Sequence, residues 1–250
     1  MRHLNIPTRP GNLLLAAALL VIASGCRMVS TGRNVDGVRY FQQGQYPVAL
    51  QRFDAAMSID PRNPDSYYNK GAIYHKMGLA ERNQNLLTQA ESLYQQCLAY
   101  NPDHVDAHRG LAVLLTETGR VPQSFDLLKS WVARSPQNAD ARVELARLYE
   151  EYGDRQTAEQ ALNDALAVNM QNWRAHAALG RLREQSGDLA QALQNYERSY
   201  TLNHFQPQLE QRIADLRGKV SPLAPGTTTP LPGTTIATRN AAAPAPFRRY

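Results

Sequence analysis

Small and apolar residues recur along the middle of the chain with the spacing of amphipathic α-helices. Residues at i, i+4 and i+7 lie on one face of a helix, so a run with this spacing buries that face. The two clearest runs are Ala49, Phe53 and Ala56, and then Ala158, Leu162 and Ala165. The pattern predicts an all-α chain in which successive helices pack through these faces.

The helical pattern repeats with a period of 34 residues. The period is marked by glycines, which suit the left-handed turn between two helices, and by prolines. These marks are Gly44 and Gly78, then Gly119, Gly153 and Gly187, and also Pro102 and Pro136. They divide the chain into five units at residues 30–63, 64–104, 105–138, 139–172 and 173–206.

Each unit also carries one small residue in each of its two expected helices, where we expect the helices to cross. These pairs are Gly37 and Ala49, Gly71 and Ala90, Ala112 and Ser124, Ala146 and Ala158, and Gly180 and Ala192. Asn63, Asn138 and Asn172 stand where a first helix begins and suit helix N-caps. The period and the small residues resemble the tetratricopeptide repeat, a hairpin of two antiparallel helices. The resemblance implies a right-handed α-solenoid of about five hairpins over residues 34–206.

The second unit is longer than the others. Gly78 and Ala90 are 12 residues apart, whereas the corresponding residues of the other units are 5 apart. Seven extra residues are about two helical turns, so we expect them to lengthen the second helix without rotating its buried face. Leu86 and Leu87 then lie near the edge of the stack, where they either pack locally or form a ridge that contacts a partner.

The two segments after residue 206 differ in character. Residues 207–219 place Leu209, Ile213 and Leu216 at helical spacing, which predicts a helix that caps the last unit. Residues 220–250 are rich in Pro, Thr and Ala and contain no acidic residue, which predicts an extended, disordered tail.

The beginning of the chain has the pattern of an export signal. An unbroken apolar run from Leu13 to Ala23 is too short to span a bilayer but suits a signal peptide over residues 1–25. The sequence that ends in Gly25-Cys26 resembles a bacterial lipobox. That resemblance implies a lipoprotein whose Cys26 carries acyl chains such as palmitate, followed by a short linker over residues 26–33. An ordinary secretory signal that leaves Cys26 as a free thiol is the alternative.

The charge and the side-chain chemistry exclude several classes of function. The formal net charge is +5, with no run of Lys and Arg interleaved with aromatic residues, which disfavours nucleic acid as a partner. No phosphate-binding loop or nucleophile elbow is present, so we expect no catalytic residues and no cofactor. His104 and His108 share the spacing of two metal ligands on a helix, but no third ligand is evident, so we expect no metal site.

The remaining candidate site is the groove that first helices line in proteins of the repeat family. By resemblance, the exposed groove positions are Asp65, Tyr68, His75, Arg109, Glu117, Asp140, Arg147, Glu150, Arg174, Arg181 and Glu184. Three of these arginines suit a carboxylate or an extended acidic peptide. Pairing of the same arginines with the nearby glutamates is an equal alternative.

These features together predict a membrane-anchored scaffold of the bacterial envelope that docks protein or peptide partners through its groove. Arg27, which follows Cys26, favours the outer membrane, with the protein facing the periplasm. The alternative is a carrier or adaptor that binds lipid or glycan, for which a deep apolar groove is expected. The polar character of the predicted groove disfavours that alternative, and an enzyme is a third, less favoured class.

Overall fold

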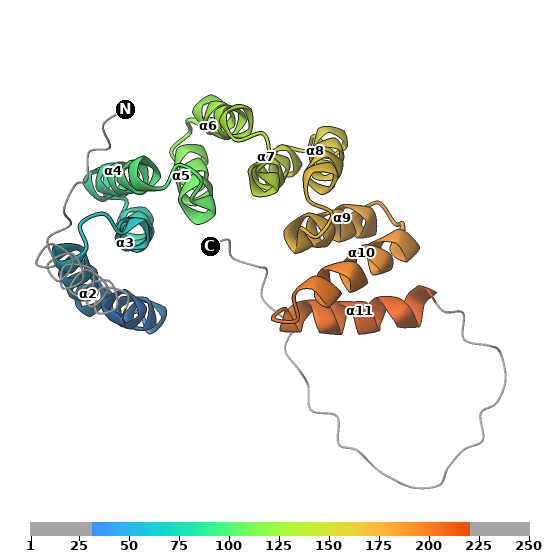
Figure 1. Cartoon of the computed structure of the whole chain (residues 1–250), viewed down its shortest axis with the longest axis horizontal. Helices are drawn as coiled ribbons and strands as arrows, with labels where there is room; N and C mark the ends of the chain where they lie inside the picture. The colour runs from blue at the N-terminus through green and yellow to red at the C-terminus, as the bar shows by residue number, and fades with distance from the viewer. Residues whose placement is uncertain (1–31, 221–250) are drawn as a thin grey trace, which may run out of the picture. The chain divides into compact units, whose positions relative to one another are not determined.

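The computed structural model describes residues 32–220, and every regular element in this range is an α-helix (Figure 1). The predicted signal peptide, Cys26 and the tail after Val220 lie outside the described residues. The described residues divide into two compact units between Leu145 and Ala146. We describe each unit by itself.

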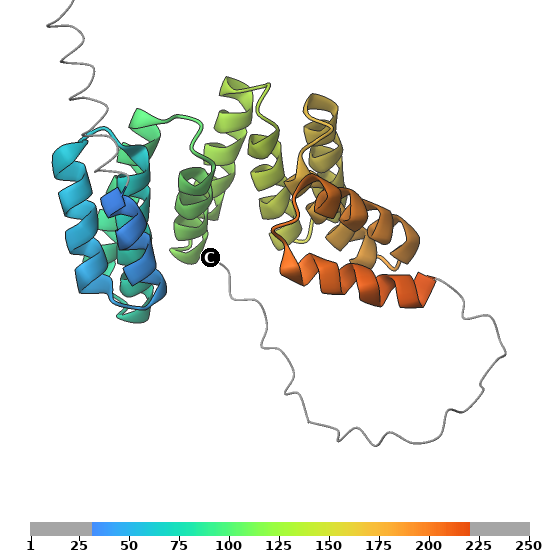
Figure 2. The same ribbon diagram turned by 60° about the horizontal axis from the view of Figure 1, so that its bottom comes forward.

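In the N-terminal unit, a helix over residues 32–42 is followed by antiparallel helices joined by tight turns (Figures 1 and 2). These helices are α2 (Tyr46–Ile59), α3 (Pro64–Ala80), α4 (Gln84–Tyr100), α5 (Val105–Glu117) and α6 (Val121–Arg134). Helix α7 (Ala139–Glu151) crosses the border of the two units. The C-terminal unit continues with α8 (Arg155–Val168), α9 (Trp173–Gln185), α10 (Leu189–Leu202) and α11 (Pro207–Val220). The all-α fold of repeated hairpins is confirmed.

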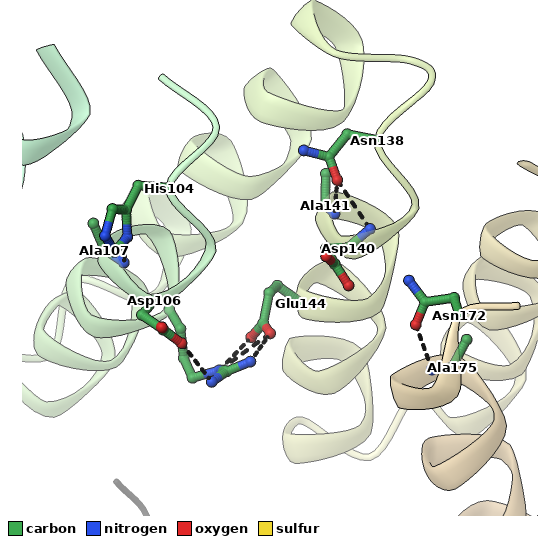
Figure 3. A network of polar contacts seen from close by, with 10 residues as sticks. His104, Asp106, Ala107, Asn138, Asp140, Ala141, Glu144, Asn172 and Ala175 are labelled. Atoms are coloured by element: carbon green, nitrogen blue, oxygen red, sulfur yellow. Dashed lines mark hydrogen bonds and ion pairs between the residues drawn. The ribbon is translucent and has the colours of Figure 1, made fainter. Parts of the chain in front are cut away.

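Each first helix from α3 to α9 begins with the same kind of cap. The side chains of Asn63, Asn138 and Asn172 accept hydrogen bonds from backbone N–H groups of the first helical turn, as predicted. His104 takes the equivalent place before α5, where its Nδ1 accepts from the N–H of Ala107 at 3.1 Å (Figure 3). The caps satisfy backbone donors that the helix itself leaves unpaired.

A second polar contact also recurs at each junction between hairpins. A side chain in the first helix donates to the carbonyl of the residue six positions earlier, in the preceding loop. The four contacts are Tyr67 to Pro61, His108 to Pro102, Arg142 to Pro136 and His176 to Met170. Three different side-chain types fill this one role, so simple inspection of the sequence does not reveal the repeat of the contact.

The turns within hairpins require one correction. Gly44, Gly119, Gly153 and Gly187 have the predicted left-handed conformation, with φ between 75° and 87°. Gly78 does not: it lies inside α3, and the left-handed residue of that turn is Arg82, at φ 51°. An L-residue in this conformation costs roughly 1–2 kcal/mol relative to the right-handed helix, a cost that glycine avoids.

The insertion in the second unit is therefore divided between its two helices. Helices α3 and α4 have 17 residues each, whereas α5 has 13 and α6 has 14. Each helix gains about one turn, so the expectation that both extra turns lengthen the second helix was wrong. The buried face is kept all the same, because one turn takes about 3.6 residues. Leu87, Ala90, Tyr94 and Cys97 remain buried on one side of α4. Leu87 packs locally, against Gly78.

The close approach within hairpins also differs from the expected pairs of small residues. In three hairpins the glycine of the first helix lies against an aromatic ring of the second helix. The aromatic residue stands four positions after the alanine that was expected at the crossing. The pairs are Gly37 with Phe53, Gly71 with Tyr94, and Gly180 with Tyr196. Where the first helix has alanine instead, a buried leucine takes the place of the ring, as at Ala112 and Leu128. The glycine leaves space for the ring, so a larger side chain at the glycine position would collide with the ring.

The C-terminal helix α11 packs against α10, as the predicted cap helix should (Figure 2). Ile213 and Leu216 are buried with Ala192 and Tyr196. Helix α11 begins at Pro207, which is 34 residues after the first residue of α9, Trp173. It is thus the first helix of a sixth unit, and its remaining faces are mostly polar.

Candidate functional site

Most of the predicted groove residues are engaged by other side chains, and two pairs join members of the predicted set, His75 with Glu117 and Arg181 with Glu150. Asp65 of α3 contacts His104 Nε2 at 3.0 Å, and this hydrogen bond lowers the pKa of Asp65. The ring of Tyr68 lies between those of Tyr94 and His104, and burial raises its pKa to about 12. These side chains hold adjacent hairpins together, so they are not free to receive a ligand without a change in their contacts.

His75 was predicted to be exposed in the groove, and this prediction was wrong. Its side chain is 4% exposed. The Nε2 atom lies 2.9 Å from Glu117 and Nδ1 lies 3.3 Å from the hydroxyl of Tyr94. The ring of Tyr94, which packs against Gly71, therefore also covers His75. Glu117, which belongs to α5, contacts the other side of the histidine ring at Nε2.

Arg109 forms an ion pair with the buried carboxylate of Glu144, which Figure 3 labels. Its guanidinium donates to both carboxylate oxygens of Glu144 and, at 3.1 Å, to Asp106. Burial by itself lowers the pKa of Arg109, but the bonds to Glu144 outweigh it and raise the pKa. Glu144 was not among the predicted site residues, because this acid stands between buried Val143 and Leu145. Glu144 stands 35 residues after Arg109, which is about one repeat period, and this spacing could have indicated the pair.

In the C-terminal unit the paired arginines are more exposed. Arg181 donates to Glu150, with Nε–Oε1 and Nη2–Oε2 distances of 3.0 and 2.6 Å. Glu184 accepts from Arg212 at 2.8 Å and from the hydroxyl of Tyr196 at 3.1 Å. Burial and the Glu184 charge raise the pKa of Tyr196. The pairing of predicted arginines with predicted glutamates is thus observed at Arg181.

The remaining predicted residues contact their own helices. Arg147 donates to Glu151 one turn later at 3.2 Å. The guanidinium of Arg174 lies 5.3 Å from the ring centroid of Trp173. Asp140 stands in the first turn of α7, where its N–H donates to Asn138.

A cavity of about 1040 Å³ opens among α9, α10 and α11. It brings the predicted residues Arg181 and Glu184 together with residues that the sequence analysis assigned only to the cap helix. Its lining is part cationic, with Arg181, Arg212 and Lys219, and part apolar, with Leu189, Tyr196, Phe205 and Leu209. Phe205 is 95% exposed at the rim. The combination suits a ligand that carries an anionic group close to an apolar one.

The two histidines that share the spacing of metal ligands, His104 and His108, form hydrogen bonds with other residues of the chain. His104 caps α5 and contacts Asp65, whereas Nε2 of His108 donates to the carbonyl of Pro102. His108 is stacked on Trp131 at 3.9 Å, and burial lowers its pKa to about 4. Among residues 32–220, no group of three or more His, Cys, Asp or Glu side chains is placed to hold a metal ion.

Burial also limits the chemistry of Cys97. Its side chain is fully buried, and this raises the pKa of the thiol to about 12. The reactive thiolate is therefore strongly disfavoured at neutral pH.

None of the helices in the described range has the length and apolar character needed to cross a bilayer.

The repeated hairpins, with their caps and glycine turns, define a helical repeat protein. Three family models match consecutive parts of the chain: a TPR repeat at residues 37–78, and tetratricopeptide repeats at residues 75–139 and 123–182. Together these matches span more than half of the sequence. The chain belongs to the tetratricopeptide repeat family.

Known proteins are similar to this chain in part of its sequence or in its fold. The chain is 37% identical over 84 residues to protein O-mannosyl-transferase tmtc2 of Xenopus laevis, which is 34% of this chain and 10% of that protein. The human protein O-mannosyl-transferase TMTC2 is 33% identical over 84 residues, with the same coverage. The chain thus spans about a tenth of the length of these relatives. A thermophilic tetratricopeptide repeat protein of Thermus thermophilus matches with a TM-score of 0.56 and 23% identity, over 75% of this chain and 98% of that chain.

Proposed function

We propose that this protein is a non-catalytic docking scaffold that binds segments of partner proteins, and that the cavity of the C-terminal unit is its principal site. The cavity of about 1040 Å³ between α9 and α11 supports this most directly, because it joins cationic and apolar side chains in one concave surface. The O-mannosyl-transferase similarity covers only 10% of those enzymes, and we assign this chain no transfer reaction.

The charges of the cavity indicate the ligand. Arg181 and Arg212 are each engaged by one glutamate, but their side chains are about half exposed and retain donors that face solvent. Lys219 has no ion-pair partner among residues 32–220 and adds a positive charge to the lining. A peptide carboxylate near these cations, with an apolar side chain against Phe205 and Leu209, fits the cavity.

The location of the scaffold is also part of the proposal. Lipidation of Cys26 would hold the chain at a bacterial membrane, and Arg27 favours the outer membrane with the protein facing the periplasm. Acyl chains at one cysteine give stable anchoring when more than one is present. Intact-mass analysis of the membrane fraction tests this: acyl mass is expected on the wild type and absent from Cys26→Ser.

Docking is tested by quantitative crosslinking in cells that express the full chain. Phe205→Ser and Lys219→Gln each alter the cavity lining without removing a buried side chain. We expect the same set of crosslinked proteins to be depleted in both variants. Tyr152→Ser is the matched control, because Tyr152 is 47% exposed and is not among the residues that line this cavity. Equal crosslinking by all four proteins would contradict the proposal.

The apolar half of the cavity favours a second candidate, a lipid- or glycan-binding carrier. Leu189, Phe205 and Leu209 supply a surface on which an acyl chain or a sugar face can pack. Native mass spectrometry of the gently purified protein distinguishes the two. A bound lipid or glycan that is lost in Phe205→Ser supports the carrier, whereas ligand-free protein supports docking of protein segments.

A further inference from the structure

The inserted turns of the second hairpin create a second, smaller cavity in the N-terminal unit, with a volume of about 530 Å³. Its lining comes from the end of the α3–α4 hairpin and from the turn of the next hairpin, α5–α6. These residues are Gly78, Leu79, Arg82, Gln84, Leu87, Glu117, Thr118 and Arg120. We call this cavity the notch. The long hairpin extends about one turn further than its neighbours, so the notch is a direct product of the insertion.

One residue of the notch stands in a backbone conformation that disfavours it. Arg82 has φ 51°, whereas the other positive-φ residues of the described chain are Gly44, Gly119, Gly153 and Gly187. Glycine would form this turn without strain, since it has no Cβ. Strained residues persist where their side chains do something that the relaxed residue cannot. The exposed side chain of Arg82 lines the notch, which is the evident reason for it.

The other charged side chains of the notch already have partners within the chain. Glu117 is held by His75 at 2.9 Å, and Arg120 donates to both oxygens of Glu91 at 3.0 and 2.7 Å. Arg82 has no ion-pair partner within the part of the chain that the structure describes. The notch thus contains one arginine without an ion-pair partner, Arg82, together with the apolar side chains of Leu79 and Leu87.

We propose that the notch is a second docking site, distinct from the cavity between α9 and α11, and that it binds an acidic side chain of a partner protein segment. The carboxylate accepts charge-assisted hydrogen bonds from Arg82, and a neighbouring apolar side chain packs on Leu79. The protein's own residues 221–250 are excluded by charge, because they contain no Asp or Glu. The inference rests on the proposed docking function only in taking the ligand to be a protein segment.

The test uses fluorescence anisotropy with the full chain and short labelled peptides of alternating glutamate and leucine. We expect Arg82→Gly to weaken binding by about tenfold, the equivalent of one charge-assisted hydrogen bond. The same variant should keep or raise the melting temperature, because glycine relieves the strained turn. Loss of binding without loss of stability separates a ligand contact from a structural role.

Two controls make the result specific. Arg62→Gly removes another exposed cation, from the loop at the opposite end of the hairpin, and binding should be unchanged. A peptide in which glutamine replaces glutamate should bind the wild type as weakly as the glutamate peptide binds Arg82→Gly. If the glutamate peptide binds wild type and Arg82→Gly equally, or binds neither, the notch is not an acidic-segment site. Variants of Phe205 and Lys219 report on the larger cavity separately, so either proposal can fail alone.

Discussion

The two units of the molecule pair arginines with glutamates between neighbouring first helices, but they bury these pairs to very different degrees. In the N-terminal unit, the side chain of Glu144 is 2% exposed and that of Arg109 is 33% exposed. In the C-terminal unit, Glu150 is 15% exposed and Arg181 is 49% exposed. An exposed pair contributes little because water and salt screen it, whereas removal of one member of a buried pair leaves a charge without a partner.

The comparison teaches that the same kind of contact has two different roles in one repeat array. The buried pair links α5 to the first half of α7, where few solvent molecules can replace either partner. The exposed pairs around Glu184 stand in the wall of a cavity, where their spare donors can exchange partners. The buried pair contributes chiefly to stability, whereas the exposed pairs in the cavity wall can also take part in binding.

The largest expected effect comes from breaking the two pairs in turn. Glu144→Ala should destabilise the protein by about 3 kcal/mol, because Arg109 is largely buried and keeps only Asp106 as a partner. Glu150→Ala should cost at most about 1 kcal/mol. Urea unfolding followed by circular dichroism measures both. Equal costs would refute the difference in role between the two units.

A second test compares the close helix crossings of the two units. A Cβ atom at Gly180 would lie 2.6 Å from the ring of Tyr196, whereas at Gly71 it would meet Tyr94 at 3.0 Å. Gly180→Leu should therefore destabilise by about 3 kcal/mol, and Gly71→Leu by less. Gly218→Leu in α11 is the control, since nothing lies within 4 Å of its Cβ position. If thermal melts rank Gly180 with Gly218, the assigned crossing is wrong.

A third test uses pH and the stacked histidine of the N-terminal unit. Burial lowers the pKa of His108 to about 4, below the 6.5 of an unfolded histidine. The neutral ring therefore adds stability that is complete above pH 6.5 and is lost as the pH falls towards 4, by roughly 2–3 kcal/mol. His108→Gln should lose that part of the acid sensitivity. His176→Gln, at the equivalent position of the C-terminal unit, is the control, and the readout is the urea midpoint at neutral and acidic pH.

The smallest expected effect is a reciprocal exchange of turn residues. Arg82→Gly should stabilise the long hairpin by about 1 kcal/mol, and Gly187→Arg should destabilise the regular hairpin α9–α10 by a similar amount. Differential scanning calorimetry of the two variants checks the signs. Loss of stability in both would mean that Arg82 supports the turn itself, and would weaken the case for a ligand in the notch.

The sequence was sufficient for those features that depend on local residue type. Asn63 caps its helix and Gly187 closes its turn because each residue favours that conformation without help from the rest of the fold. The turn at Arg82 was missed because an arginine gives no signal of a left-handed conformation, and because Gly78 happened to fall on the 34-residue period. Length and period alone do not say which helix of a hairpin takes an insertion.

The candidate site was predictable only in part, for a related reason. Arg181 and Glu184 occupy the positions that the repeat assigns to its groove, and both line the cavity. Arg212 was not predicted because residues 207–219 were expected to form only a cap and not the first helix of another unit, and Phe205 was not predicted because it lies in the loop before that helix. The partner of Arg109 was missed because an acid among buried residues looks out of place until the opposing charge is found.

Helix α11 has a consequence for how this architecture can grow. Leu179 and Leu182 of α9 stand 34 residues before Ile213 and Leu216 of α11, and all four are buried. A duplicate of residues 173–206 inserted after Gln206 would therefore offer α10 an apolar surface of the kind it already covers, and would offer α11 a second copy of α10. The array can lengthen by whole hairpins while its terminus stays as it is, so its length is open to recombination, both in evolution and in the laboratory.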